Sequence, residues 1–332
     1  QVIINQPTPL DQYVNIYTSN FNGYNISCKG SNTGEISVVT TGGYIPYSYL
    51  WSNGEVNDTI VNLYAGLYDL KVIDGMGCET NFVINLTEPE NILSGNIYST
   101  KDYNGFDISC FGKEDGSLIE VPSGGVPPYS FLWSNGDTLE ITSNLKSEYY
   151  EVFVRDNNNC LWIDSITLNQ PDSFFIIVDT FPDTCNKGVG LVNINPYGGV
   201  SGYLYNWLSQ EDTIGLFDNL FEGVYFIIIN DKNQCEIRDS IFIRNLKKPI
   251  TNFDIFNSPS NWIEQLNNPI VFVDQTVGGW QEIVYREWDF GDGYYGYDSI
   301  SYHTFNEMGS YKVILKVFTE FNCIDTISKN II

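Results

Sequence analysis

The chain has 332 residues, enough for two to four domains, and its 41 acidic and 16 basic residues give a formal net charge of −25. This charge repels nucleic acid and anionic lipid surfaces, and no apolar run reaches the roughly 18 residues that a membrane span needs. We therefore expect neither nucleic-acid binding nor membrane insertion. Runs of Val, Ile, Tyr, Phe and Thr broken by Gly, Asn, Asp and Pro favour an all-β fold.

The first seven residues have the form of a closing strand. Val2–Pro7 (VIINQP) has the same pattern as Ile166–Pro171 (ITLNQP) much further along the chain. We therefore expect residues 1–7 to be the last strand of a truncated preceding repeat, and the chain to be a segment of a longer array.

Three repeats follow. The sequence of Gly42–Gly54 recurs at Gly124–Gly136 and, with more substitutions, at Gly198–Trp207. Its Gly-Gly pair indicates a tight turn, and the strand after it places aromatic residues on one face and ends at a Trp. Together with prolines 82 positions apart, these copies predict repeat 1 at 8–89, repeat 2 at 90–171 and repeat 3 at 172–249.

Each repeat is expected to be an immunoglobulin-like β-sandwich, because short strands are closely spaced within about 80 residues. In repeat 1 the strands are predicted at 13–18, 35–40, 47–51, 59–63, 68–73 and 79–86, with a hairpin turn over 74–77. The expected core residues are Trp51, Leu63, Tyr68 and Val72, then Trp133, Leu145, Tyr150 and Val154, then Trp207, Leu220, Tyr225 and Ile227.

The cysteine spacing predicts one disulfide in each repeat. The two cysteines of every repeat are 50 positions apart and flank one copy of the Gly-Gly stretch. The predicted pairs are Cys28–Cys78, Cys110–Cys160 and Cys185–Cys235. A reduced metal site is the alternative, but the chain has one His and no C-x-x-C, so zinc ligands are lacking. Disulfides indicate an oxidising compartment.

The repeats share a series of short motifs: Cys-x-Gly, then Gly-Gly-x-x-Pro-Tyr followed by Trp-Ser-Asn-Gly, then Asn-Leu-x-x-x-Tyr, Asp-x-x-x-Cys and a closing Pro. This pattern resembles the SprB repeat of giant surface adhesins in gliding Bacteroidetes. Repeats 1 and 2 carry the pattern over nearly their whole length. Repeat 3 departs from it: Asn186-Lys187-Gly188 replaces Cys-x-Gly, the Pro-Tyr is missing and Trp207-Leu208-Ser209 replaces Trp-Ser-Asn-Gly.

Residues 250–332 have a different pattern, with Trp288-Asp289-Phe290-Gly291-Asp292-Gly293, His303-Thr304-Phe305 and the alternating strand Tyr311–Val317. On these features the segment resembles a polycystic-kidney-disease (PKD) domain, which is a β-sandwich. Trp288 and Phe290 are expected to face the core, and Gly-Asp-Gly to form the turn after them. Cys323 is left unpaired; its partner would lie beyond Ile332, or it is a buried thiol.

No catalytic constellation stands out, so we predict that the chain is not an enzyme. His303 is the only histidine, and its place in the PKD pattern favours a structural role; no acidic pair, P-loop or EF-hand loop is evident. No cofactor is expected, apart from a structural Ca²⁺ that acidic residues at turns would bind. The candidate ligands are Asp115, Asp156, Asp289 and Asp292; Asx-turn formation is the alternative role.

Asp followed by Ser or Thr and an aliphatic residue recurs, and resembles the O-glycosylation signal of exported Bacteroidetes proteins. The alternative is that the pair merely starts a strand. The candidate sites are Thr59, Thr138, Ser165, Thr213, Ser240, Ser299 and Thr326.

The predicted architecture is a tandem array of four immunoglobulin-like β-sandwiches forming an elongated rod, each touching its neighbours in the chain. The SprB resemblance implies a non-catalytic part of a cell-surface adhesin for gliding motility and attachment, outside the outer membrane, whose partners are the type IX secretion and gliding machinery and surface polysaccharide. One alternative is the stalk of a secreted polysaccharide-degrading enzyme. Another is a carbohydrate-binding module using Tyr294, Tyr295 and Tyr297.

Overall fold

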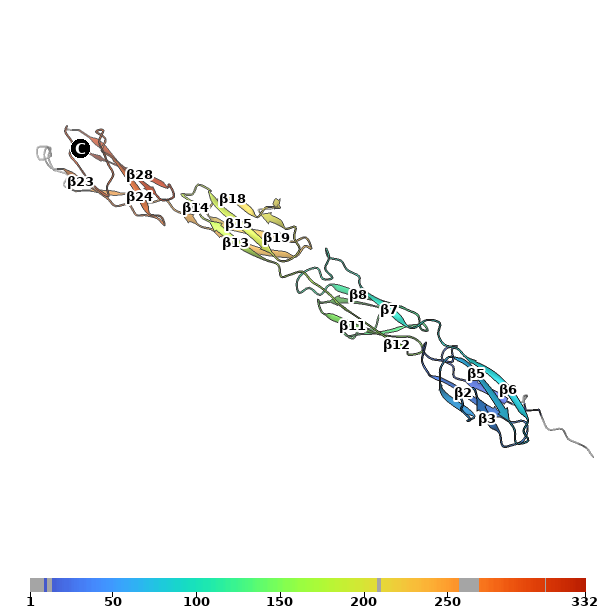
Figure 1. The fold of residues 1–332 in the computed structure, drawn as a ribbon. Helices are drawn as coiled ribbons and strands as arrows, with labels where there is room; N and C mark the ends of the chain where they lie inside the picture. The colour runs from blue at the N-terminus through green and yellow to red at the C-terminus, as the bar shows by residue number, and fades with distance from the viewer. Residues whose placement is uncertain (1–8, 11–13, 208–209, 257–268, 308) are drawn as a thin grey trace, which may run out of the picture. The chain divides into compact units, whose positions relative to one another are not determined.

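The computed structural model describes residues 9–10, 14–207, 210–256, 269–307 and 309–332. The strand expected at residues 1–7 lies outside these ranges. All the named elements of the described part are β-strands (Figure 1), and they form successive two-sheet sandwiches. The predicted all-β fold of tandem immunoglobulin-like domains is therefore confirmed. The chain divides into two compact units, residues 1–171 and residues 172–332.

Repeat 1 consists of two antiparallel three-stranded sheets. Their strands begin within two residues of the predicted positions, because the apolar alternation and the Gly, Asn and Asp turns mark each boundary. One sheet has the order β1-β2-β4, from β1 (Val14–Thr18), β2 (Gly34–Thr40) and β4 (Thr59–Leu63). The other has the order β3-β5-β6, from β3 (Ser48–Trp51), β5 (Gly66–Ile73) and β6 (Glu79–Leu86).

Repeat 2 has the same topology as repeat 1. Its first sheet, β10-β8-β7, contains β7 (Ser94–Ser99), β8 (Gly116–Ser123) and β10 (Ile141–Leu145). Its second sheet, β12-β11-β9, contains β9 (Ser130–Trp133), β11 (Tyr149–Arg155) and β12 (Leu161–Thr167). The copied sequence thus gives a copied strand order, as expected where turns and apolar faces recur at the same spacing.

Repeat 3 keeps this plan with additions. One sheet, β13-β15-β18, contains β13 (Phe175–Phe181), β15 (Gly190–Tyr197) and β18 (Leu216–Leu220). The other, β17-β16-β19-β20, contains β16 (Leu204–Trp207), β17 (Gln210–Asp212), β19 (Gly223–Asn230) and β20 (Glu236–Ile243). A short parallel pair joins β14 (Asp183–Thr184) to β21 (Asn245–Leu246).

The PKD-like domain also has two sheets. The first, β22-β23-β26, contains β22 (Phe253–Phe256), β23 (Ile270–Asp274) and β26 (Ile300–His303). The second, β25-β24-β27-β28, contains β24 (Ile283–Asp289), β25 (Tyr295–Gly296), β27 (Tyr311–Thr319) and β28 (Ile324–Ile331). The alternating strand predicted at Tyr311–Val317 is β27, and a further strand, β28, pairs with it along its length.

Each sandwich has its own hydrophobic core built around one tryptophan. Trp51, Trp133, Trp207 and Trp288 are all buried, and Phe290 lies beside Trp288 as predicted. The indole N–H groups of Trp51, Trp133 and Trp288 each donate to a backbone carbonyl, which satisfies the one polar atom that these side chains bury. The other predicted core residues are buried or packed against the cores: Leu63, Tyr68, Val72, Leu145, Tyr150, Val154, Leu220, Tyr225 and Ile227.

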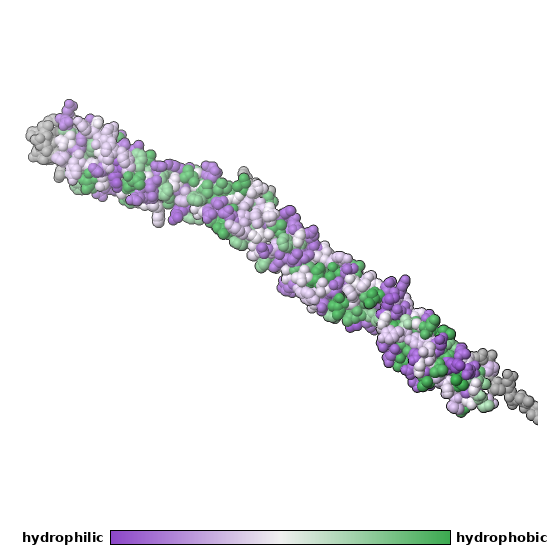
Figure 2. Space-filling model, viewed as in Figure 1, coloured by the Kyte–Doolittle hydropathy of each residue, from purple (hydrophilic) through white to green (hydrophobic). Residues whose placement is uncertain are grey.

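The outer faces of the sheets carry both apolar and polar residues. β12, for example, has exposed and half-buried residues in strict alternation. Figure 2 shows the result on the face in view, where green apolar residues are interspersed with purple polar ones. In the described part of the chain, no helix is long and apolar enough to cross a membrane.

Candidate functional site

An aspartate-capped loop holds the second cysteine of each of the three repeats. In repeat 2, Asp156 Oδ1 accepts hydrogen bonds from the backbone N–H groups of Asn158 and Cys160, and its Oδ2 accepts one from Val126 N–H. Asp74 in repeat 1 and Asp231 in repeat 3 make the corresponding bonds to the loops that end at Cys78 and Cys235. The cysteine is therefore held in a fixed position at the start of the strand that follows it.

The second glycine of each Gly-Gly pair leaves space for the carboxylate of this aspartate. Gly43, Gly125 and Gly199 have φ values of +69°, +59° and +59°. A Cβ added at any of them would lie 2.5–2.6 Å from the carboxylate oxygen of the aspartate. A side chain is thus excluded both by the backbone conformation and by the close approach. The backbone N–H groups that donate to Asp74 lower the pKa of its carboxyl group below the ordinary value, and the bond from Cys78 N–H contributes most.

In unit 1, a disulfide joins repeat 1 to repeat 2. It links Cys28 to Cys160, with a Cα–Cα distance of 5.7 Å, which is within the ordinary range for a disulfide. Asn158 Nδ2 donates to the carbonyl oxygens of Phe21 and Ser27, and Asn22 Nδ2 donates to Asn158 Oδ1 at 2.7 Å. The covalent bond is therefore surrounded by amide hydrogen bonds between the two repeats.

In unit 2, a second disulfide joins repeat 3 to the PKD-like domain. It links Cys185 to Cys323, with a Cα–Cα distance of 5.5 Å. Cys323 N–H donates to Thr319 Oγ1, so Thr319 takes the place of the aspartate in this loop. Lys187 Nζ also donates to the Asn322 carbonyl across the same junction.

An ion pair supports the linker beside this second disulfide. Asp325 accepts hydrogen bonds from Lys248 Nζ at 2.8 Å and from Thr251 N–H at 2.9 Å. Partial burial alone would raise the pKa of Asp325, but these donors outweigh it and lower that pKa below its ordinary value. The carboxylate thus stays charged and fixes the linker to β28.

The predicted pairing of cysteines within each repeat is wrong. Cys28 is bonded to Cys160 and Cys185 to Cys323, while Cys78 is a free, exposed thiol. The predicted pairs Cys28–Cys78, Cys110–Cys160 and Cys185–Cys235 therefore do not form, and Cys323, predicted to be unpaired, is bonded. Cys110 and Cys235 are disulfide-bonded as well.

The physical reason is that the two cysteines of a repeat lie at opposite ends of the sandwich. Cys28 lies near the end of β6. The backbone N–H groups of Asn25 and Ile26, just before it, donate to the carbonyl oxygen of Thr87, which directly follows β6. Cys78 comes immediately before the start of β6. Eight strand residues span about 26 Å, far beyond the reach of a disulfide. The strands predicted from the sequence already indicated this separation, because they placed a full strand, residues 79–86, between Cys78 and the repeat boundary at residue 89.

The four calcium candidates lie in loops or, for Asp289, at the end of β24, and their carboxylates accept hydrogen bonds from nearby groups of the chain. Asp115 accepts from Ser109, Asp156 from the loop described above, and Asp289 from Gly291 N–H. Asp292 accepts from Tyr294 N–H. Within the described ranges, no three His, Cys, Asp or Glu side chains are grouped so that they could hold a metal ion.

His303 lies inside the PKD-like domain. Its ring stacks on Phe290 with centroids 4.2 Å apart and meets the edge of Phe305, while its Nε2 lies 2.7 Å from Asp292 Oδ2. The histidine thus joins the Gly-Asp-Gly turn to the core, an arrangement that fits the structural role predicted for it.

Most of the candidate glycosylation residues are exposed. Thr59 is half-buried, and its hydroxyl lies 3.1 Å from that of Ser37. The exposed ones are Thr138, Ser165, Thr213, Ser240, Ser299 and Thr326. Their accessibility is compatible with modification, and occupancy stays a prediction.

Sequence reasoning missed a buried carboxyl group in repeat 2. Glu120 on β8 is fully buried, and within the described part of the chain neither its carboxyl oxygens nor the nearby Trp162 Nε1 has a hydrogen-bond partner. Burial, together with the negative charge of Asp164, raises the pKa of Glu120 to about 7. Strand register places Val38 and Ile194 at the equivalent positions of repeats 1 and 3.

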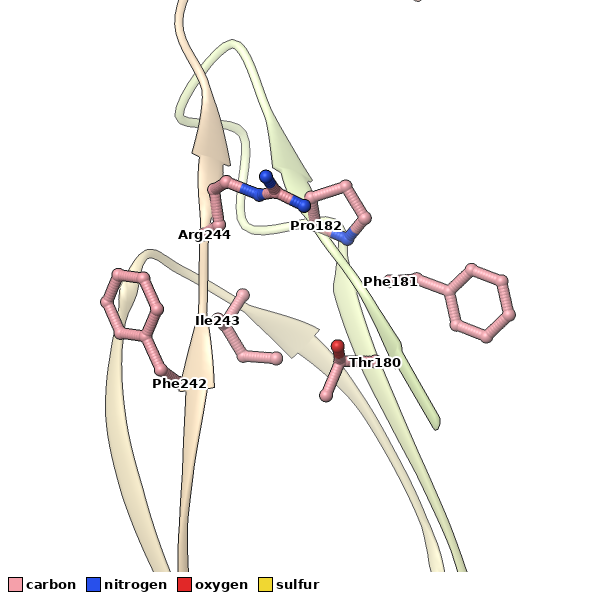
Figure 3. Close-up of a pocket in the computed structure, with 6 residues that line it drawn as sticks. All are labelled: Thr180, Phe181, Pro182, Phe242, Ile243 and Arg244. Atoms are coloured by element: carbon pink, nitrogen blue, oxygen red, sulfur yellow. The ribbon is translucent and has the colours of Figure 1, made fainter. Parts of the chain in front are cut away.

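One pocket lies on repeat 3 between β13 and β20 (Figure 3). It has a volume of about 280 Å³ and is lined by Thr180, Phe181, Pro182, Phe242, Ile243 and Arg244. In Figure 3 the Arg244 side chain extends toward Pro182, and the Phe181 ring points away from the other side chains. Arg244 is the single charged group in this lining, so the pocket contains no acid–base pair.

The family comparison matches the two best-preserved repeats. The SprB repeat matches residues 22–56 and 106–138. Repeats 1 and 2 resemble SprB repeats, as predicted. The two matches contain Cys28 and Trp51 of repeat 1 and Cys110 and Trp133 of repeat 2. No curated protein sequence matches the chain.

Solved structures similar to the chain include PKD domains and cadherin arrays. The PKD1 domain of Vibrio anguillarum Epp is 20% identical, with 26% of this chain and 92% of that chain covered and a TM-score of 0.22. The PKD1 domain of the Vibrio cholerae metalloprotease PrtV is 24% identical, with 25% and 94% covered and a TM-score of 0.22. Cadherin domains 3–6 of protocadherin gamma B2 are 11% identical, with 92% and 96% covered and a TM-score of 0.29.

Proposed function

We propose that this chain is a non-catalytic structural segment of a bacterial cell-surface adhesin that takes part in gliding motility and attachment. The observation that carries the proposal is that disulfides join one domain to the next: Cys28 to Cys160 and Cys185 to Cys323. A bond inside a domain protects that domain, whereas a bond between domains holds a junction that would otherwise bend or separate. The match of residues 22–56 and 106–138 to the SprB repeat supports the adhesin part of the proposal.

The disulfides also support a location outside the cytosol, where thiols are not kept reduced. On this proposal, the chain is exported by type IX secretion to the exterior of the outer membrane, and exposed Ser and Thr residues such as Ser165 and Ser240 carry O-glycans. Purification from the native host, followed by intact-mass measurement, tests the glycans. A mass equal to the bare polypeptide contradicts them.

In-frame deletion of residues 1–332 in the native host tests the adhesin function. We expect loss of colony spreading and of attachment to glass, with unchanged growth on polysaccharides. A matched control restores the wild-type segment, which should recover spreading and attachment. Normal spreading in the deletion strain, or loss of polysaccharide hydrolysis instead, would favour the enzyme-stalk alternative.

A second candidate function, carbohydrate binding, is favoured by one exposed groove in unit 2. It has a volume of about 670 Å³ beside the Cys185–Cys323 bond and includes Trp280, a residue that is 74% exposed, together with Lys248 and Glu222. An exposed indole beside polar groups can stack on a sugar ring. The predicted Tyr294, Tyr295 and Tyr297 are exposed too, and Tyr297 stacks on Tyr285. Glycan-array binding that Trp280→Ala abolishes would support this candidate.

A further inference from the structure

The disulfides follow a directional rule along the chain. Within unit 1, the first cysteine of repeat 1, Cys28, is bonded to the second cysteine of the next domain, Cys160. Within unit 2, the first cysteine of repeat 3, Cys185, is bonded to Cys323, which occupies the second-cysteine position of the PKD-like domain. In both units, the second cysteine is joined to the domain that precedes it in the chain.

Cys78 is a second cysteine that lacks this bond. Its loop has the same internal hydrogen bonds as the loop of Cys160: Asp74 Oδ1 accepts from Met76 N–H and Cys78 N–H, as Asp156 Oδ1 accepts from Asn158 N–H and Cys160 N–H. Cys78 is therefore presented in the same way as a cysteine that is bonded. It differs in exposure, since Cys160 is 8% exposed beneath repeat 1 whereas Cys78 is open to solvent.

The other six cysteines of the chain are disulfide-bonded, so none of them is available to Cys78. Cys78 also lies at the opposite end of repeat 1 from Cys28, the end that faces away from the junction with repeat 2. Met76 in the same loop is 71% exposed, at the position where Asn158 contacts the preceding repeat. An exposed thiol and an exposed apolar side chain together mark an uncovered contact surface.

We propose that Cys78 is the attachment site for another domain of this kind, which lies before repeat 1 and bonds to it through the cysteine equivalent to Cys28. The partner is thus a β-sandwich whose first-cysteine loop carries Cys-x-Gly, as Cys28-Lys29-Gly30 and Cys110-Phe111-Gly112 do. This inference rests on the connectivity of the disulfides and is independent of the adhesin function.

The bond forms by thiol–disulfide exchange. The Cys78 thiolate attacks a disulfide of an extracytoplasmic protein oxidant, which gives a mixed disulfide and releases one thiol of the oxidant. The thiolate of the partner domain then attacks the Cys78 sulfur and releases the second thiol. Two protein thiols are oxidised to one disulfide, and one disulfide of the oxidant is reduced to two thiols.

Peptide mapping of the protein from its native host tests the proposal. The sample is alkylated without reduction, digested and analysed by tandem mass spectrometry. We expect the Cys78 peptide to be disulfide-linked to a Cys-x-Gly peptide that does not occur in residues 1–332. An alkylated Cys78, a Cys78–Cys78 link between two copies, or a link to a small thiol would each overturn the proposal.

A Cys78→Ser variant expressed in the native host provides a second readout. We expect the Cys-x-Gly peptide of the partner domain to become alkylable, since it loses its bond, while Cys28–Cys160 stays intact. Met76→Leu is the matched control and is expected to leave the partner peptide protected. A partner peptide that is equally protected in the Cys78→Ser variant would contradict the proposal.

Discussion

At the scale of single residues, the repeat depends on a glycine and an aspartate that are far apart in sequence. Gly125 and Asp156 are 31 positions apart, yet the carboxylate lies where the glycine side chain would be. The Gly-Gly pair could be recognised as a turn from the sequence. The reason for the second glycine could not, because it requires the long-range contact with the cysteine loop.

Replacing Gly125 with Ala should destabilise the loop that presents Cys160. The substitution places a Cβ in the left-handed region and 2.5 Å from Asp156 Oδ2, so we expect a loss of about 2 kcal/mol in local stability. Native-state hydrogen exchange at the amides of Val126 and Cys160 measures it. Gly136→Ala is the control, with a φ of +95° and no atom within 4 Å of the added carbon. Equal effects of the two substitutions would show that steric contact with Asp156 is unimportant.

Gly95 and Glu120 form a second pair in which a glycine leaves room for a carboxyl group. A Cβ added at Gly95 would lie 1.9 Å from Glu120 Oε1, so the absent side chain at Gly95 makes room for the buried carboxyl. At the equivalent positions, repeat 1 has Val14 and Val38. An apolar pair is thus replaced by a glycine and a glutamate, a change that no rule of β-strand patterning predicts.

The stability of repeat 2 should fall as the pH rises from about 4.5 to 7. The folded state raises the pKa of Glu120 to about 7, so the folded chain binds more protons than the unfolded chain in this window. The full loss, on the order of 3 kcal/mol, is reached above pH 7. Urea unfolding followed by the methyl signals of Val152 and Val154 measures it. In Glu120→Val this pH dependence should vanish, and an unchanged profile would exclude Glu120 as its source.

At the scale of elements, the strands could be predicted from the sequence, and their positions argue against a bond within a repeat, but which cysteines of different domains are joined could not be predicted. Strand positions follow from local alternation and from turn residues, which recur with each copy. Cys28 and Cys78 fit a constant spacing of 50 positions, but constant spacing in a repeat reports only that the copies are alike. Which cysteines meet depends on the end of the sandwich at which each one lies.

Breaking the Cys28–Cys160 bond should expose the junction between repeats 1 and 2. The loop after Cys28 holds this junction, because Gly30 N–H donates to Glu88 and Lys29 Nζ donates to the Glu90 carbonyl. In Cys28→Ser/Cys160→Ser, we expect a glutamate-specific protease to cut after Glu90 several-fold faster than in the wild-type chain. Cys78→Ser is the matched control. Equal cleavage rates in the double variant and the control would show that the disulfide does not restrain the junction.

At the scale of the whole chain, the disulfides shorten the covalent path between its ends. The two bonds span 132 and 138 positions, and the residues inside these loops cannot add to the distance between the chain ends while the bonds are intact. About 60 of the 332 residues lie outside the loops and can be pulled out to full length. In single-molecule pulling from both termini, we expect a maximal extension of about 200 Å for the oxidised chain and of about 1,100 Å after reduction. Similar extensions in the two states would mean that the bonds do not form in solution.

The same connectivity decides what happens when a peptide bond is cut. A nick by a protease anywhere between Cys28 and Cys160 leaves the two halves joined through the sulfur atoms, and the same holds between Cys185 and Cys323. Across most of its length, the polypeptide chain therefore stays in one piece after a single peptide bond is cut. Severing it there requires two chemically different events, hydrolysis of an amide and reduction of a cystine.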